Sequence, residues 1–200
     1  MNPFTSVTRA IVTGVIIALV IAALIAPVQF NQLGLARWCH IIFGITWIGL
    51  LYYFNVVQTP GLAAAAADKG GPGGAGVSKY IAPRALLWFR WSALLTWVMG
   101  FCYLAYRGSL GAFALGLEKS PVDNYELTIG VGAWLGTIML FNVWALIWPN
   151  QKKILGIVTA TDDEKAKARK VALYASRANF ILSIPMLMCM ASAFHHSLPI

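Results

Sequence analysis

The sequence predicts an all-α integral membrane bundle of five transmembrane helices, forming a single membrane domain over residues 1–200. Three observations predict this fold class. Hydrophobic residues make up 59% of the 200 residues, charged residues make up only 11%, and the mean hydropathy is +0.70. A soluble domain carries roughly 25% charged residues, so this chain lacks the polar side chains that cover a water-soluble globule. The composition also excludes a disordered chain and a disulfide-stapled secreted module.

Long stretches with few or no charges define the predicted helices. A membrane-spanning helix needs about 20 predominantly apolar residues, and five stretches meet this requirement. Their predicted bounds are residues 9–29, 36–58, 83–107, 126–149 and 172–195. The apolar core of the first stretch is long for a signal peptide, so we expect it to be a helix of the protein.

Three connections have distinct compositions. Residues 61–79 are rich in Gly and Ala, which predicts a flexible cytoplasmic linker. The segment from Arg107 to Glu126 is a mildly acidic loop with an apolar stretch of its own. Residues 159–170 look helical, with Thr161 as the N-cap and acidic residues in the first turn.

The distribution of basic residues predicts the orientation and the partner. With the N-terminus in the cytoplasm and the C-terminus in the periplasm, only Arg37, Arg107 and Lys119 of the 15 Lys and Arg residues fall on the outer side. This bias follows the positive-inside rule. The net charge of +8 therefore belongs to the ends of apolar segments, which favours a lipid bilayer as the partner and argues against nucleic acid.

The three histidines are predicted to lie at one level of the membrane. His40 is about one turn into the second helix from the outer side, and His195 and His196 fall at the outer end of the fifth helix, because about 24 residues rise roughly 36 Å. Two antiparallel helices thus bring imidazoles together. Facing imidazoles in a helical bundle are the axial ligands that b-type haem requires.

The neighbours of His40 suit a flat ligand. Gly44, at i+4, leaves room on the same helix face, and Trp47, at i+7, can pack against the edge of a macrocycle. Interfacial or solvated imidazoles are the simpler alternative. A metal held by three imidazoles is a weaker one, because no carboxylate lies nearby to support the ligands. No CxxCH motif occurs, so a covalent c-type haem is excluded.

A second polar group lies toward the predicted cytoplasmic side. Polar residues inside a membrane usually face the bundle or a wet cavity. They can act as contacts between helices, or they can form a small pocket for an anion or substrate. The residues of this possible inner pocket are Asn55, Arg90, Asn142 and Arg177. In addition, Gly132 and Gly136 form a GxxxG step that permits close helix packing.

Four segments resemble the urate oxidase N-terminal domain family, which is the membrane domain of bacterial cytochrome-c-linked urate hydroxylases. They lie in the same order as in the family and extend over the last four predicted helices. The segments are Trp38-Cys39-His40 through Trp47-Ile48-Gly49 to Tyr53-Phe54; Trp88-Phe89-Arg90-Trp91 with Thr96-Trp97 and Gly100; Asn142-Val143 with Ile147 to Lys153; and Asn179-Phe180 through Pro185 to His195-His196.

The resemblance implies a redox function at the bacterial inner membrane. Family members are usually joined to a C-terminal cytochrome c, and this sequence ends before any such module. We therefore expect a b-type haem protein that exchanges electrons with a separate periplasmic cytochrome c or within a larger respiratory or oxidative complex. His40 and either His195 or His196 would be the haem iron ligands.

Two other functions stay open at this stage. One is an enzyme, either urate hydroxylase-like or similar to the haem-binding membrane protoporphyrinogen oxidases, although the basic L-P-R segment of the latter is replaced here by residues 55–60. The other is an accessory subunit without a cofactor that packs against a larger membrane complex. Catalytic residues cannot be assigned from the sequence.

Overall fold

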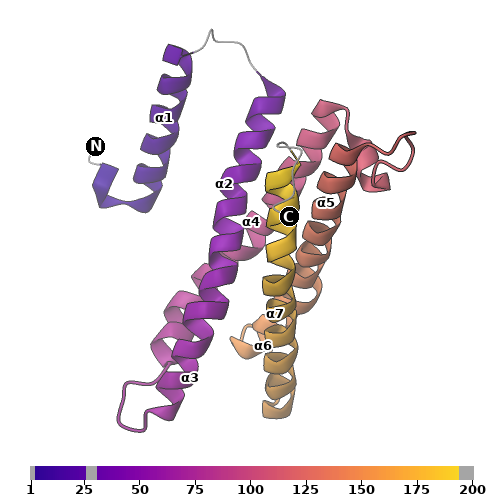
Figure 1. The fold of residues 1–200 in the computed structure, drawn as a ribbon. Helices are drawn as coiled ribbons and strands as arrows, with labels where there is room; N and C mark the ends of the chain where they lie inside the picture. Colours follow the sequence, from indigo (N-terminus) through magenta and orange to yellow (C-terminus); the bar gives the residue numbers. More distant parts are fainter. Residues whose placement is uncertain (1–2, 26–30, 194–200) are drawn as a thin grey trace. The chain divides into compact units, whose positions relative to one another are not determined.

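The computed structural model describes residues 3–25 and 31–193, and its regular structure is helical (Figure 1). The chain divides into two compact units, residues 1–32 and 33–200, where the sequence predicts a single domain. The first unit contains α1 (Val7–Ile25), which has no buried side chain. Every residue of the two hydrophobic core clusters lies in the second unit, and this accounts for the division.

The second unit is built from four long helical segments. They comprise α2 (Gln32–Tyr52), η2 (Tyr53–Gln58) and α3 (Thr59–Ala67); η3 (Val77–Ile81) and α4 (Ala82–Arg107); α5 (Asn124–Phe141), η5 (Asn142–Ile147) and α6 (Trp148–Ile154); and α7 (Asp162–Ser192). With α1, five helical segments are long and apolar enough to cross a membrane. The predicted number of spans is therefore confirmed.

Wider π-helical turns precede the proline in three of these segments. The turns η2, η3 and η5 each end two residues before a proline, namely Pro60, Pro83 and Pro149. A proline has no N–H and its ring crowds the carbonyl four residues earlier. In all three cases the residue before the proline donates to the carbonyl five residues earlier, as Trp148 does to Val143. The helix thus continues through each proline as a π-bulge.

The helices extend further than the sequence predicts at several ends. The predicted linker, 61–79, is shorter in the structure, because α3 continues to Ala67 and η3 begins at Val77. The predicted N-cap Thr161 is confirmed: its side chain accepts from the Glu164 N–H in a capping box. Because residues 162–172 contain no Gly or Pro, the helix that begins there continues into the last predicted span, and the two form α7.

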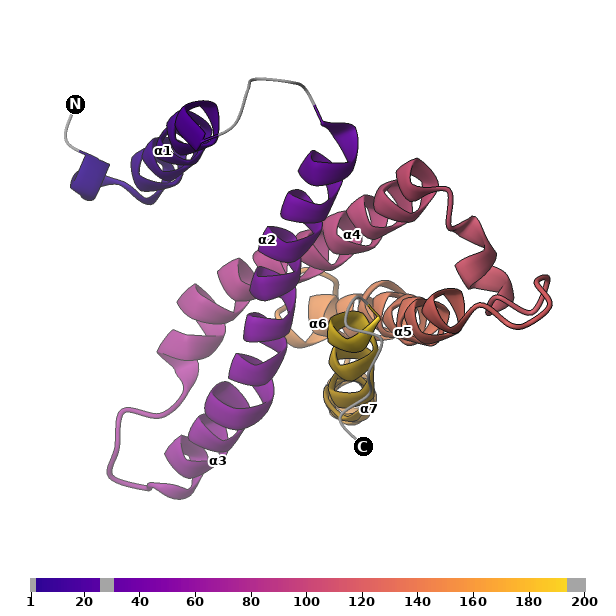
Figure 2. The ribbon, with the colours of Figure 1, turned by 45° about the horizontal axis from the view of Figure 1, so that its top comes forward.

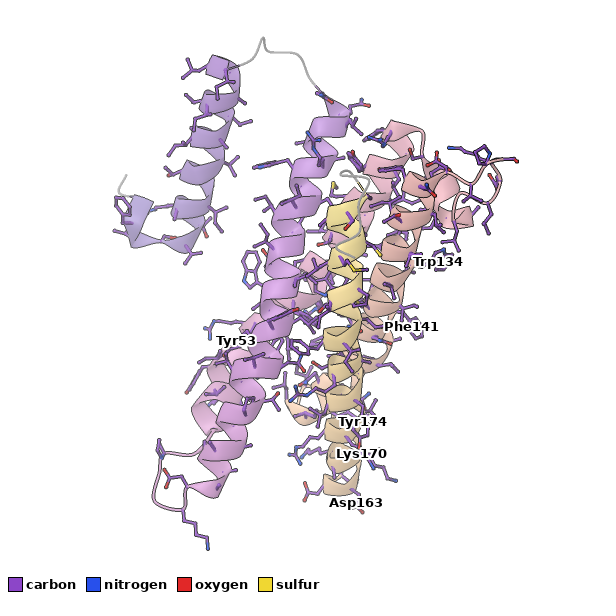
Figure 3. All side chains as sticks on the ribbon, in the orientation of Figure 1. Tyr53, Trp134, Phe141, Asp163, Lys170 and Tyr174 are labelled. Atoms are coloured by element: carbon purple, nitrogen blue, oxygen red, sulfur yellow. The ribbon has the colours of Figure 1, made fainter. Side chains whose placement is uncertain are left out.

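The second unit has two distinct ends. At one end, which we call the basic end, α6 packs on the first turns of α7, and these carry Lys152, Lys153, Lys165, Lys167, Arg169 and Lys170. Lys170, Tyr174 and Asp163 mark this end in Figure 3. At the other end the 3₁₀-helix η4 (Leu110–Ala114) packs on α5. Between them α5 and α7 lie side by side (Figures 1 and 2).

Candidate functional site

A pocket of about 650 Å³ opens in the second unit, between α2, α4, η4, α5 and α7. This volume lies within the range of about 300–1,000 Å³ that is typical of small-molecule and cofactor sites. The three described residues that the sequence predicts for cofactor binding, His40, Gly44 and Trp47, all line it. The structure therefore brings these three together at one apolar cavity.

His40 is held by a hydrogen bond that fixes its tautomer. Its Nδ1 lies 2.8 Å from the backbone oxygen of Thr96, in α4. A carbonyl only accepts, so Nδ1 carries the proton and Nε2 carries a lone pair. Within the described residues Nε2 has no hydrogen-bond partner. A metal-ligating histidine usually donates its other ring N–H to a carbonyl or carboxylate in this way.

Two glycines make room around His40. A Cβ on Gly100 of α4 would lie 2.9 Å from the imidazole atoms Cε1 and Nδ1, so the ring occupies space that any side chain would fill. Gly44 faces the same helix, where an added Cβ would lie 3.6 Å from Thr96 Cγ2. The sequence pointed to Gly44 through its spacing from His40. Thr96 and Gly100 are in one of the family-like segments, but nothing in the sequence linked them to His40.

Trp47 and Arg37 add polar atoms to a largely apolar wall. Trp47 is only 2% exposed, and its indole Nε1 is buried without a hydrogen-bond partner in the described part of the chain. Arg37 lines the pocket one helical turn before His40. Residues three apart in a helix share a face, so Arg37 and His40 lie on the same side of α2.

An aromatic wall closes the pocket on the η4 side. Trp97 and Phe101 of α4 stack with ring centroids 5.7 Å apart, and Phe113 of η4 lies 5.9 Å from Phe101. Trp134, labelled in Figure 3, donates from its indole to the Phe113 oxygen at 3.1 Å. A Cβ on Gly130 would collide with the Ala112 carbonyl. Glycine at this position of α5 thus allows η4 to pack closely on α5, and η4 in turn contributes Phe113 to the pocket.

The predicted GxxxG step has a divided role. A Cβ on Gly132 would lie 3.1 Å from Cys189 Cβ, so this glycine lets α5 approach α7 closely. Gly136 has nothing within 4 Å of such a Cβ, and it lines the pocket instead. One glycine of the pair therefore serves helix packing and the other leaves cavity space.

The second predicted ligand cannot be placed. His195 and His196 lie outside the described residues, which end at Ala193. The last described turns of α7 contribute Met190 and Ala191 to the pocket. No group of three or more His, Cys, Asp or Glu residues that could hold a metal ion occurs within residues 3–25 and 31–193.

The predicted inner residues make separate contacts between helices. Asn55 donates to the Leu51 carbonyl and to Ser176 Oγ of α7, both at 2.9 Å. Asn142 donates to Asn179 Oδ1 at 2.8 Å, and Asn179 in turn donates to the Met139 carbonyl at 2.9 Å. These bonds use the amide donors to join η2 and α5–η5 to α7.

The two inner arginines take no part in those bonds. The Arg90 guanidinium stacks on Trp148 of α6, with its Cζ 3.7 Å from the ring centroid. Arg177 is exposed on α7. The four predicted residues are thus distributed over different contacts and do not line one pocket in the described part of the chain.

The residues around the pocket fit a flat, largely apolar cofactor with a metal centre. They provide one imidazole with a free lone pair, glycines that leave space, and aromatic side chains on one wall. The buried indole N–H of Trp47 and the cation of Arg37 are positions for polar atoms of such a group. Neutral imidazole is the form that binds haem iron or another transition metal.

Comparison with known proteins supports the resemblance for part of the chain. Residues 124–199 match the family model described as urate oxidase N-terminal, so the segment from α5 onward is similar to the family that the sequence motifs resemble. His40 and α4 lie before the matched residues. Comparison with curated proteins and with solved structures gave no match.

Proposed function

We propose that this chain is a membrane haem protein that binds b-type haem in the His40 pocket and exchanges electrons with a partner. The single observation that carries the proposal is the fixed tautomer of His40, whose Nδ1 donates to the Thr96 carbonyl within a pocket of about 650 Å³. Haem b, when bound, supplies a one-electron iron couple. His195 or His196 would provide a second imidazole to hold the iron.

The chain's own residues would tune and shield this group. The Thr96 carbonyl, by accepting from Nδ1, raises the basicity of the ligating Nε2 and fixes the orientation of the ring. The aromatic side chains Trp97, Phe101 and Phe113 exclude water from the pocket. Arg37, beside His40, would pair with acidic groups at the edge of the cofactor.

The proposed orientation places this pocket toward the periplasm. Lysines and arginines gather at the basic end, on α6 and the first turns of α7, and basic residues favour the cytoplasmic side. The pocket lies toward η4, at the other end of the unit. A periplasmic cytochrome c, or a larger complex of the bacterial inner membrane, is then the electron partner within reach.

The experiment is a reduced-minus-oxidised absorption spectrum of the detergent-purified protein. The wild type is expected to give a b-type spectrum and His40→Ala to lose it. Thr46→Ala is the matched control, because Thr46 lies on the same helix and its hydroxyl donates to the Ile42 carbonyl of its own helix. A colourless wild type that also fails to take up added haem would overturn the proposal and favour an accessory subunit.

The similarity of residues 124–199 to urate oxidase N-terminal favours one narrower candidate, a urate hydroxylase-like oxidoreductase. In that case urate would be the electron donor. Adding urate without oxygen should then reduce the bound haem, or an added cytochrome c, in the wild type. A haem that is reduced by dithionite but not by urate would remove urate as the donor while leaving the haem proposal in place.

A further inference from the structure

Two cations at the basic end share one indole ring. The Arg90 guanidinium of α4 stacks on Trp148, with Cζ 3.7 Å from the ring centroid, and Lys152 Nζ of α6 lies 6.0 Å from the same centroid. Such cation–π contacts fix where a positive charge stands without neutralising it. A ligand that approaches Trp148 therefore meets two positive charges held by neighbouring helices.

No carboxylate compensates these charges in the part of the chain that the structure describes. The ion pairs of that part are formed by Lys119, Lys153 and Lys165. Neighbouring Lys153 pairs with Glu164 at 3.9 Å, whereas Lys152 and Arg90 have no acidic partner. Both cations lie near one ring without a described acid, so an anion within reach of both would lower the free energy of the folded protein.

The spacing of two arginines on α4 is comparable with the thickness of the hydrocarbon core of a membrane. At about 1.5 Å per residue, Arg90 and Arg107 of α4 are about 26 Å apart, close to the roughly 30 Å of the hydrocarbon core. Arg107 stands at the other end of α4, with its Cζ 4.3 Å from the ring centroid of Tyr125. With Arg107 at one face of the hydrocarbon core, Arg90 would stand near the other face, where its long side chain can reach the headgroups.

Apolar side chains next to Arg90 are exposed on α4. Leu87 is 44% exposed, Trp88 55% and Trp91 47%. A free anion would gain nothing from these side chains, whereas the acyl chains of a lipid would cover them. Charge, depth and apolar surface therefore coincide at one place on the molecule.

We infer that Arg90, Trp148 and Lys152 form a binding site for the phosphate of an anionic phospholipid. Arginine recognises phosphate through parallel N–H donors, and lysine adds a point charge. Basic sites between membrane helices bind anionic headgroups on the cytoplasmic side. This site is separate from the His40 pocket and does not depend on the haem proposal.

The test is the thermal unfolding midpoint of the detergent-purified protein, titrated with dioctanoyl phosphatidylglycerol. Dioctanoyl phosphatidylcholine and inorganic phosphate are titrated at the same concentrations. A ligand that binds the folded state raises the midpoint, and we expect phosphatidylglycerol alone to do so. Arg90→Gln and Lys152→Gln should each weaken its apparent affinity about tenfold, as expected for a lost charge-assisted hydrogen bond.

Two further variants keep the test decisive. Lys165→Gln is the matched control, since Lys165 is at the same end and its Nζ lies 3.7 Å from Asp162; it should bind as the wild type does. Arg90→Lys keeps the charge and should bind with intermediate affinity. The site would be overturned if both Lys152→Gln and Arg90→Lys bind phosphatidylglycerol as tightly as the wild type does. It would also be overturned if phosphatidylcholine raises the midpoint as much as phosphatidylglycerol does. If inorganic phosphate raises the midpoint as much as phosphatidylglycerol does, the site binds free phosphate and not a lipid headgroup.

Discussion

Around His40 and around Asn179 the same bundle treats polar side chains in opposite ways. Asn179 is fully buried, and its amide both accepts from Asn142 and donates to the Met139 carbonyl. Within residues 3–25 and 31–193, His40 makes a hydrogen bond through one ring nitrogen, to the Thr96 carbonyl, and it lines a cavity that Gly44 and Gly100 also line. A bundle built only for stability would satisfy both sites alike. The unused lone pair and the space around it indicate that the His40 region is kept for a ligand.

The largest effect is expected from Gly100→Ala, which sharpens this contrast. The new Cβ would stand 2.9 Å from the imidazole, so the ring must turn away from its bond with Thr96. Haem affinity should fall about tenfold or more, in line with an overpacking cost of about 1–3 kcal/mol. The measurement is a haem titration followed by absorption.

Gly49→Ala is the matched control, because Gly49 also lines the pocket and an added Cβ meets nothing within 4 Å. Equal haem affinity in the two alanine variants would contradict the role given to Gly100.

Asn179→Ala should lower stability and leave the pocket intact. It removes both amide bonds and leaves the Asn142 amide without its acceptor. Polar contacts between membrane helices contribute about 0.6–1.7 kcal/mol each, so the unfolding midpoint in detergent should fall by several degrees. The haem spectrum should stay that of the wild type. If Asn179→Ala loses the haem spectrum while its unfolding midpoint stays that of the wild type, Asn179 serves haem binding and not the packing of the bundle.

Gly130→Ala tests the wall between the pocket and η4. Its Cβ would collide with the Ala112 carbonyl, so η4 must move and shift Phe113. We expect destabilisation of about 1–3 kcal/mol from overpacking, read from the unfolding midpoint. Gly136→Ala, in the same helix and with open space at the Cβ position, should cost less. If Gly130→Ala and Gly136→Ala have the same unfolding midpoint, the close contact at Gly130 does not position η4.

The smallest effect concerns the loop between η4 and α5, where Lys119 Nζ lies 2.8 Å from Asp123 Oδ2. The hydrogen bond from Lys119 is the main cause that lowers the pKa of Asp123 below its ordinary value of 3.8. A lowered carboxyl pKa stabilises the fold above the ordinary value, and this contribution is lost as the pH falls through the lowered pKa.

Asp123→Asn should therefore flatten the acid side of the stability profile. Asparagine can still cap α5, where the Asp123 side chain accepts from the Tyr125 and Glu126 N–H groups. The measurement is the unfolding midpoint between pH 3 and 7 (roughly the range in which carboxyl groups titrate). If the unfolding midpoint of the variant falls with decreasing pH as steeply as that of the wild type, carboxyl groups other than Asp123 control stability in acid.

Much of this fold follows from the sequence, because hydropathy and helix caps act locally. The five spans and the Thr161 cap are of this kind. The π-bulges before Pro60, Pro83 and Pro149 were not predicted, since a proline alone does not tell whether the helix ends or widens.

The sequence predicted only some of the residues of the candidate site. Helical spacing placed Gly44 and Trp47 on the face of His40. Thr96 and Gly100 reach His40 from another helix, and such a long-range contact has no local signal. For the inner residues, polarity within a span predicted contact with the bundle, and the bonds of Asn55 and Asn142 to α7 agree with that.

The most direct test of the central claim measures bound haem per protein and the unfolding midpoint together, for His40→Ala beside Asn179→Ala. In His40→Ala the Thr96 carbonyl keeps its place in the α4 helix, so the account predicts loss of haem with a nearly unchanged midpoint of the haem-free protein. Asn179→Ala should keep haem and unfold at a lower temperature. Full haem occupancy in His40→Ala would contradict the account.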